Sequence, residues 1–539
     1  MGWKLLVLLL LFDVVFMKVI IDKTKLMKTE DFDKTNFIDV RDLYQKESEQ
    51  MERPRKDITL ALNLPYTRPL SEYPVRSDLN APRFYASAAA IAIQDINANP
   101  DLLRGYQLKY YWNKTITDTH CNEETAVKNF KKQMTMNFDG FIGYQCSCTK
   151  VGRLAAQANL PLFSMGCQEE DLSNKTLYPT FSRTTNLNPD VSQMIKMFLK
   201  KQKIKELAVI YQKDMWIHIE GNGNINMYWE KIYKDLKKNG SRDNGFNITL
   251  SKEIAHYEYF DDEYNSQIFE SFLKDCKSKT KVIMVMLEKG RLQHFMMTAR
   301  KMNMTNGDYV FIAVHPFATA EQFLRNTQTL KDYVWVLPWS GYYGDGNKEK
   351  AFFFGEKNEM MEAFSRLFVI QPKIPRSDED FKGFQKRVVE GMSKEPFQSD
   401  AYERTFIGQK KGTKVSPPPE AHQLYDAVML YAHGLNKTLS KGYSVTNGSD
   451  IIQNILNTRH ISITNSPYIV NCNGDSQTLY EVRQFQFDQK DKDLPLKKIF
   501  QPKRIFGFEA KNVDCNDSNR AEENNFYLIE PDETDSGGQ

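Results

Sequence analysis

The chain has 539 residues, of which 41% are hydrophobic and 26% are charged, a composition close to that of ordinary globular proteins. The 72 Lys and Arg residues stand against 69 Asp and Glu residues, which leaves a net charge of +3, so no electrostatic signal favours a nucleic-acid partner. The 34 Phe, 26 Tyr and 6 Trp residues exclude a largely disordered protein, because so much aromatic surface requires a core.

The N-terminal segment predicts secretion. A short basic start is followed by an apolar run over residues 5–12, and Asp13 and Lys18 interrupt the apolar character beyond it. A membrane-spanning helix needs about 20 mostly apolar residues, so a cleaved leader fits better than an anchor or a buried helix. We predict a signal peptide over residues 1–22, a flexible and charge-rich spacer over residues 23–56, and a secreted, extracellular protein.

The rest of the chain agrees with an extracellular location. No later window of 18 residues is apolar and free of charge, so we expect no membrane span in this chain, and residues 501–539 are predicted to form a polar C-terminal tail. Eight Asn-x-Ser/Thr sequons indicate a glycosylated surface. They are Asn113, Asn174, Asn239, Asn247, Asn303, Asn436, Asn447 and Asn516.

Strands and helices alternate along the chain. The apolar run 58–64, which ends before Pro65, predicts a buried strand, and the Ala-rich stretch 85–98 predicts a helix that ends before Pro100. Further strands are expected at 106–112, 138–143, 161–164, 207–211, 281–286, 308–313 and 480–487. Further helices are expected at 124–134, 149–159, 190–200, 265–274, 291–302 and 420–439. Alternation of this kind predicts parallel sheets that are covered by helices on both faces.

Motifs of catalysis and metal binding are missing from the sequence. Cys146-x-Cys148 lacks the C-x-x-C spacing of zinc sites and has no His-x-x-x-His partner. Gly221-x-Gly223 lacks the third glycine or the Lys-Ser/Thr pair of a phosphate-binding loop, and no Gly-x-Ser-x-Gly elbow is present. We therefore expect no enzymatic activity, no catalytic residue, no metal and no organic cofactor.

Residues 142–184 carry the most specific pattern. They contain Gly143-x-x-Cys146 after a strand, then Val151-Gly152-Arg153, Leu160-Pro161-Leu162 and Tyr178-Pro-Thr-Phe-Ser-Arg183. Together with Asn99-Pro-Asp-Leu-Leu103, Tyr425-Asp-Ala427 and Asn473-Gly-Asp475, the pattern resembles the extracellular regions of natriuretic-peptide receptors and receptor-type guanylyl cyclases. Those regions have the type I periplasmic-binding-protein fold. The likeness covers about residues 57–490.

The resemblance implies an α/β fold with two doubly wound lobes, a hinge and an inter-lobe cleft. It places the ligand-binding region at 57–500, with lobe 1 at about 57–183 and 340–455 and lobe 2 at about 184–339 and 456–500. Closure of the lobes, or rotation of a dimer, converts binding into movement. The implied partners are a peptide hormone or small-molecule ligand and a second copy or another receptor chain. Membrane attachment is expected only if the chain is a truncated receptor.

The resemblance also implies a site at one edge of the sheet, because doubly wound sheets bind ligands beyond the carboxyl ends of their strands. Arg153 matches a position that faces bound hormone, although it fits an exposed helix charge as well. The family holds a chloride at the turn that contains Gln145 and Cys146, where the same N–H groups could merely cap a helix. This loop is about two residues shorter here than in the natriuretic-peptide receptors.

An alternative ligand class is an amino acid or transmitter, as in receptors of the metabotropic kind. Those receptors use small hydroxyl residues on both cleft loops. Ser147 and Thr149 fit the first loop, whereas Met165-Gly166-Cys167 departs from the pattern on the second. We count Ser147, Thr149, Gly166 and Cys167 as ligand-binding candidates beside Arg153.

The seven cysteines fit an oxidising compartment. The resemblance pairs Cys121 with Cys146, and Cys148 and Cys167 lie at strand ends on the same rim and form a second expected pair. The partners of three others stay open: Cys276, Cys472 and Cys515. Cys515 either bridges a dimer or pairs with Cys472, which would leave Cys276 free.

Overall fold

The structure is a computed structural model of the whole chain. It describes residues 56–67, 82–185, 187–213, 228–240, 246–254, 262–287, 289–314, 362–373, 379–402, 417–487, 500–510 and 526–529. The expected signal peptide, the spacer up to residue 55, Cys515 and Asn516 lie outside these ranges, as does the side chain of Asn239. Within the ranges, no helix combines the length and the apolar character needed to cross a lipid bilayer.

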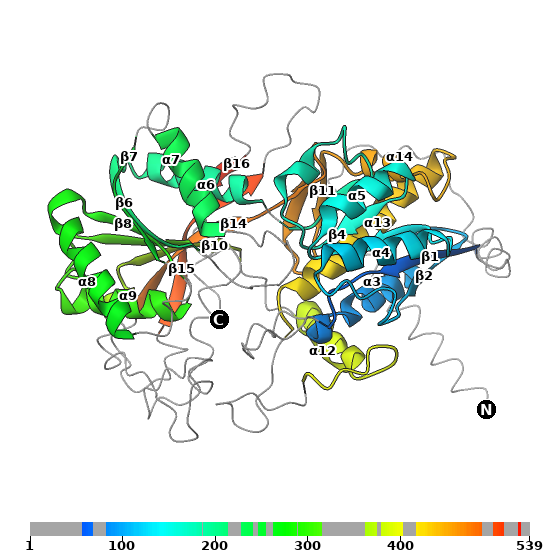
Figure 1. The fold of residues 1–539 in the computed structure, drawn as a ribbon, viewed down its shortest axis with the longest axis horizontal. Coiled ribbons are helices and arrows are strands. Elements are labelled where there is room, and N and C mark those ends of the chain that lie inside the picture. The colour runs from blue at the N-terminus through cyan, green and yellow to red at the C-terminus, as the bar shows by residue number, and fades with distance from the viewer. Residues whose placement is uncertain are drawn as a thin grey trace, which may run out of the picture. The chain divides into compact units, whose positions relative to one another are not determined.

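The first sheet has five parallel strands in the order β2-β1-β3-β4-β5. The strands are β1 (Lys56–Leu62), β2 (Tyr106–Tyr111), β3 (Gly140–Ile142), β4 (Leu162–Ser164) and β5 (Phe181–Arg183). The helices between them are α3 (Ser87–Ala98), α4 (Glu123–Met134) and α5 (Cys148–Gln157), and α13 (Glu420–Ser440) packs on α3. We call this sheet with its helices the first lobe (Figure 1).

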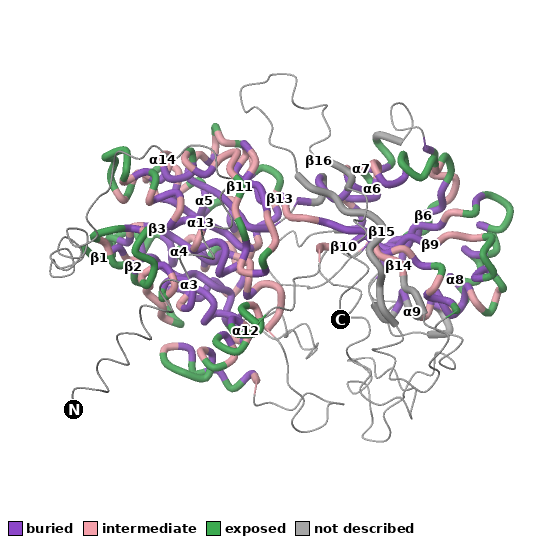
Figure 2. The backbone as a smooth tube through the Cα atoms, turned by 180° about the vertical axis from the view of Figure 1, so that it is seen from behind, coloured by how far each residue is buried: buried purple, intermediate pink, exposed green. Residues whose placement is uncertain are grey.

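Successive residues of β1 point to opposite faces of that sheet, and each face has its own core. Leu60 and Leu62 join a cluster with α3 and α13, which includes Val428. Ala61 joins the cluster on the other face, with Phe130 of α4 and α5 residues. Burial on both faces explains why the inner strands β1, β3 and β4 are largely apolar, whereas the edge strand β2 is partly exposed. Figure 2 shows the largely buried interior of this lobe.

Local signals set the ends of the helices. The Asn122 side chain accepts a hydrogen bond from the backbone N–H of Thr125 at 2.9 Å and so caps α4. Acidic residues occupy the first turn of α4 and basic residues occupy its last turn, which complements the helix dipole. The helix α3 is rich in alanine and ends at Ala98, with Asn99 as its C-cap directly before Pro100.

The second sheet has eight described strands in the order β16-β15-β14-β10-β9-β8-β6-β7. Five are parallel: β6 (Glu206–Gln212), β7 (Asn247–Ile254), β8 (Val282–Met286), β9 (Val310–Val314) and β10 (Leu367–Pro372). Three are antiparallel: β14 (Tyr480–Phe487), β15 (Phe500–Ala510) and β16 (Phe526–Ile529). One face packs on α6 (Asn188–Lys201) and α7 (Tyr228–Gly240), the other on α8 (Asp262–Lys279) and α9 (Lys289–Lys301). This sheet with its helices is the second lobe.

The chain passes between the lobes three times within the part of the sequence that the structure describes. It leaves the first lobe after β5, returns after β10 to form α12 (Glu379–Met392), α13 and α14 (Gly448–Gln453), and leaves again before β14. A three-stranded antiparallel sheet of β11 (Thr458–Ile461), β12 (Pro467–Val470) and β13 (Ser476–Thr478) precedes the last crossing. Alternate residues of β12 join different cores, Tyr468 and Val470 that of the first lobe and Ile469 that of the second.

Two lobe boundaries differ from those expected. Residues 340–455 were predicted to lie in lobe 1, but Leu367–Ile370 of β10 pair with Phe311–Val314 of β9, so β10 belongs to the second lobe. The return to lobe 2 was predicted at residue 456, whereas β12 still contributes to the first core and the crossing follows β13. The short, buried β10 carries no periodic signal that separates it from a loop next to a new domain. The tail is a further correction, since residues 501–539 were predicted to lie outside the ligand-binding region, but β15 pairs with β14 and β16 pairs with β15 in the second sheet. The other boundaries stay predictions.

Candidate functional site

Two neighbouring loops join at the carboxyl edge of the first sheet. The loop after β3 and the loop after β4 exchange backbone contacts, since the N–H of Cys167 donates to the carbonyl of Gln145 at 2.9 Å and that of Met165 to Tyr144 at 3.3 Å. Ser164 Oγ adds a bond to the same Tyr144 carbonyl at 2.6 Å. The carboxyl edge is the place where doubly wound sheets bind their ligands.

Gly166 is the point of closest approach between these loops. A Cβ atom built at this position would lie 2.4 Å from the carbonyl oxygen of Gln145 and 2.7 Å from its Cα. Backbone atoms cannot give way as a flexible side chain can, so the contact requires glycine. The second loop therefore has no room for a hydroxyl side chain at residue 166.

Two disulfides fix the same rim. Cys121 is bonded to Cys146 and Cys148 to Cys167, with Cα–Cα distances of 5.5 and 5.9 Å, and these are the two pairs that the sequence analysis expects. Each such bridge typically contributes about 2–4 kcal/mol. Cys276 is a buried free thiol whose pKa burial raises to about 12. Cys472 is also disulfide-bonded.

The five ligand-binding candidates differ in how accessible their side chains are. Ser147 precedes α5 in the left-handed conformation, with φ of 63°, and Thr149 and Gly166 are half-buried beside it. Arg153 is exposed on α5, and its guanidinium lies 5.1 Å from the ring centre of Tyr178. Cys167 is 1% exposed and its sulfur forms a disulfide, so it has no side-chain atom free to contact a ligand.

The turn before α5 lies at a helix N-terminus, a position that favours anions. Gln145 and Cys146 lie directly before the N-terminus of α5, where the helix dipole favours negative charge. The side chain of Gln145 accepts a hydrogen bond from the Tyr85 hydroxyl at 3.1 Å, which fixes its orientation. Chloride binding by these two residues stays a prediction.

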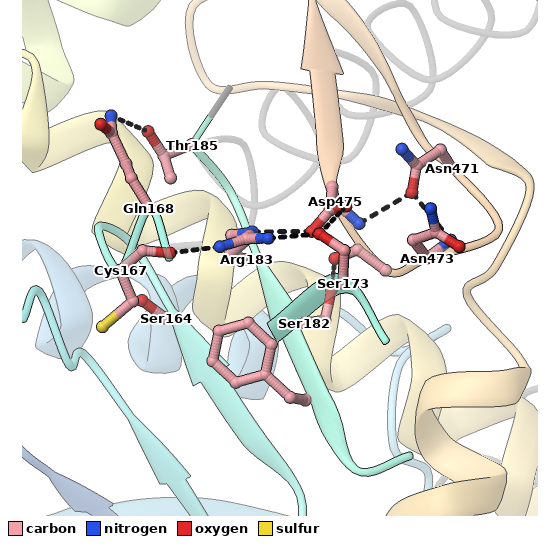
Figure 3. Close-up of polar contacts among 12 residues, drawn as sticks. Ser164, Cys167, Gln168, Ser173, Ser182, Arg183, Thr185, Asn471, Asn473 and Asp475 are labelled. Atoms are coloured by element: carbon pink, nitrogen blue, oxygen red, sulfur yellow. Dashed lines mark hydrogen bonds and ion pairs between the residues drawn. The ribbon is translucent and has the colours of Figure 1, made fainter. Parts of the chain in front are cut away.

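A buried ion pair lies where β5 ends (Figure 3). Arg183 Nε donates to Asp475 Oδ1 at 2.6 Å, and the two side chains are 0% and 1% exposed. The guanidinium also donates to the carbonyl of Glu169 at 2.9 Å and to Ser173 Oγ at 2.6 Å. Ser173 in turn donates to the second Asp475 oxygen at 2.7 Å, so both carboxylate oxygens are used.

Backbone contacts hold this ion pair between two crossing segments. Arg183 and Asp475 form a parallel β-bridge, and the Arg183 N–H donates to the carbonyl of Gly474 at 3.0 Å. The Asn471 side chain accepts from the N–H of Asn473 at 2.9 Å and of Asp475 at 3.0 Å, which shapes the β12–β13 turn. Arg183 lies just before the first crossing of the chain between the lobes, and Asp475 lies just before the third. We call residues 173–190 and 471–477 the lobe junction.

Two more ionisable groups lie in the lobe junction, Lys175 half-buried and Asp190 buried. Lys175 Nζ donates to the carbonyl of Phe181 at 2.6 Å, and burial lowers its pKa to about 8. Asp190, in the first turn of α6, accepts a hydrogen bond from Gln477 Nε2 at 3.0 Å, and burial raises its pKa to about 7. Buried charges of this kind need partners, because removal from water is costly.

Sequence reasoning did not assign a role to the lobe junction. Phe181-Ser-Arg183 and Asn473-Gly-Asp475 carried part of the family resemblance, but the two segments are 292 residues apart at the ion pair. The local sequence shows only that a charged residue, Arg183, directly follows two buried strand residues. It does not indicate which residue pairs with Arg183.

The fold defines a class of protein, namely two α/β lobes joined by three crossing segments, as in type I periplasmic-binding-protein-like proteins. Residues 85–488 match the receptor family ligand binding region, and the chain belongs to that family. The resemblance seen in residues 142–184 is thereby confirmed. The match is to a ligand-binding region and not to a catalytic domain.

Curated relatives are receptors. The chain is 25% identical over 408 residues to the Resact receptor of Arbacia punctulata, covering 73% of this chain and 38% of that receptor. It is 24% identical over 402 residues to the Speract receptor of Strongylocentrotus purpuratus, covering 73% and 33%. It is 22% identical over 344 residues to Atrial natriuretic peptide receptor 3 of Bos taurus, covering 62% and 53%. The chain thus spans between a third and about half of the length of these relatives.

Proposed function

We propose that this chain binds a peptide outside the cell and converts binding into movement of its two lobes. The family match over residues 85–488 carries the proposal, and relatives named as receptors for resact, speract and atrial natriuretic peptide support a peptide ligand. The two disulfides of the described region fit an oxidising, extracellular compartment. In this proposal the chain itself performs no catalysis.

The carboxyl edge of the first sheet favours a peptide over an amino acid. An amino-acid sensor of the metabotropic kind would need hydroxyl groups on both loops, and Gly166 leaves no room for one at its position. The exposed guanidinium of Arg153 is available to a carboxylate or carbonyl group of a peptide. Ser147 and Thr149, at the start of α5, are the proposed polar contacts beside it.

A calorimetric screen tests the proposal. The purified chain is titrated with a pool that contains resact, speract and atrial natriuretic peptide, and separately with the common amino acids. We expect heat of binding from the peptide pool and none from the amino acids. Micromolar binding of an amino acid without any peptide binding would overturn the proposal.

Two charge-reversal variants test whether the peptide contacts Arg153. Arg153→Glu should weaken peptide binding by about tenfold or more, the loss of one charge-assisted contact. Arg104→Glu changes an arginine whose side chain is 72% exposed beside Asp101 and should leave affinity unchanged. Equal effects of the two substitutions would place the peptide elsewhere. Light scattering with and without peptide would show whether a second copy takes part.

A further inference from the structure

A buried carboxyl group links two of the three crossing segments. Asp190 lies in the first turn of α6, where the chain has just left the first lobe, and Gln477 lies in β13, where the chain is about to leave it for the last time. Gln477 Nε2 donates to Asp190 Oδ1 at 3.0 Å. Asp190 is 8% exposed, and its Oδ2 is buried without a hydrogen-bond partner among the described residues.

The charged neighbours of Asp190 act in opposite directions on its ionisation. Asp475 of the β12–β13 turn disfavours a negative charge on Asp190, whereas Arg183 at the end of β5 and the backbone N–H of Leu187 favour it. Arg183 is already bound to Asp475 at 2.6 Å. Burial is the largest influence and raises the pKa of Asp190 to about 7. Lys175 is the further cation at the lobe junction, and it interacts with Asp475.

We propose that Asp190 is a pH-sensitive latch of the lobe junction, which holds the first and third crossing segments together when neutral and releases them when ionised. A neutral carboxyl group can stay buried beside Gln477, since it loses little on leaving water. A carboxylate with one unpaired oxygen regains its hydration only if the crossing segments separate. Acidic conditions therefore stabilise the arrangement seen in the structure, and higher pH favours its opening.

The size of the effect follows from the linkage between protonation and opening. An aspartate in water has a pKa of 3.8, and in the closed junction the value is about 7. Between pH 5.5 and 7.5 the equilibrium constant for opening should therefore rise by about twentyfold, with most of the rise below pH 7. The latch bears on the lobe movement assumed in the proposed function, but it is a property of the chain without any ligand.

Hydrogen exchange on the unliganded full chain tests the latch. Protection factors of the backbone amides of residues 183–185 and 471–477 are measured from pH 5.5 to 7.5 and corrected for the intrinsic exchange rate. In the wild type they should fall about twentyfold, and in Asp190→Asn they should stay level. The control is Asp235→Asn, which removes a more exposed acid of α7 that pairs with Lys196 at 3.1 Å, and it should follow the wild type.

A second variant separates the latch from a general loss of structure. Gln477→Leu removes the side-chain donor that stabilises the carboxylate, so the pH midpoint of the exchange change should move upward. Level protection in the wild type, an undiminished fall in Asp190→Asn, or a midpoint in Gln477→Leu that is unmoved or lower would each overturn the latch. Because no ligand is present, these outcomes do not depend on whether a peptide binds.

Discussion

Replacing Arg183 by methionine removes the cation of the buried ion pair and leaves Asp475 in place. The guanidinium and the carboxylate are 0% and 1% exposed and lie 2.6 Å apart. Methionine fills much of the same volume, so the main loss is electrostatic. The carboxylate keeps its bond from Ser173 but would have no cation at hydrogen-bond distance among the residues that the structure describes.

The expected cost is about 3–5 kcal/mol of unfolding free energy, because breaking one half of a buried pair leaves an uncompensated charge in the protein interior. The carbonyl of Glu169 also loses a donor at 2.9 Å. Asp475→Asn should be destabilising by a similar mechanism. The double variant carries neither charge and should lose less than the sum of the two, with a coupling of about 1–3 kcal/mol.

Urea unfolding followed by circular dichroism measures these free energies on the four proteins of the cycle. The control is Arg104→Met, since the Arg104–Asp101 pair is exposed, with side chains 72% and 81% accessible, and its loss should change stability by about 0.5 kcal/mol or less. The reasoning fails if Arg183→Met is no more destabilising than Arg104→Met, or if the double variant is as unstable as the two single losses added together.

Three further expectations rest on other parts of the first lobe. Gly166→Ala should lower unfolding free energy by about 1–3 kcal/mol through its clash with the facing carbonyl, whereas Gly383→Ala, in open space on α12, should be neutral or stabilising in the same urea assay. Asn174→Gln should remove one glycan by mass spectrometry, because Asn174 is exposed. Asn447→Gln should leave the mass of attached glycan unchanged, because its amide already donates to the aspartate of its own turn. Exchange of chloride for gluconate should lower the melting temperature if the turn before α5 holds an anion, and an unchanged value would contradict that site.

The main elements of both lobes follow from local patterns. The apolar run 58–64 and the Ala-rich stretch 85–98 correspond to β1 and α3, and the late strand 480–487 matches β14 in both bounds. The first two segments are buried along most of their length, so the apolar pattern that predicts them coincides with the core of the first lobe.

The lobe junction is beyond the reach of local patterns. Arg183 and Asp475 are paired through a topology in which three crossings bring distant segments together. The need for glycine at residue 166 likewise arises from the approach of a second loop. The sequence motifs marked both places through family resemblance, but the contacts that explain them are long-range.

The first lobe is built from segments that lie far apart in the sequence, which delays its completion during synthesis. Its five strands are complete at Arg183, but α13, which together with α3 covers one of their faces, begins at Glu420, roughly 240 residues later. At typical translation rates of about 5–20 residues per second, the part of that apolar face that α13 covers stays exposed for on the order of 10–50 seconds. A nascent chain of this design should depend on chaperones during that interval, and a ribosome-stalled chain that ends before α13 should be unusually sensitive to protease.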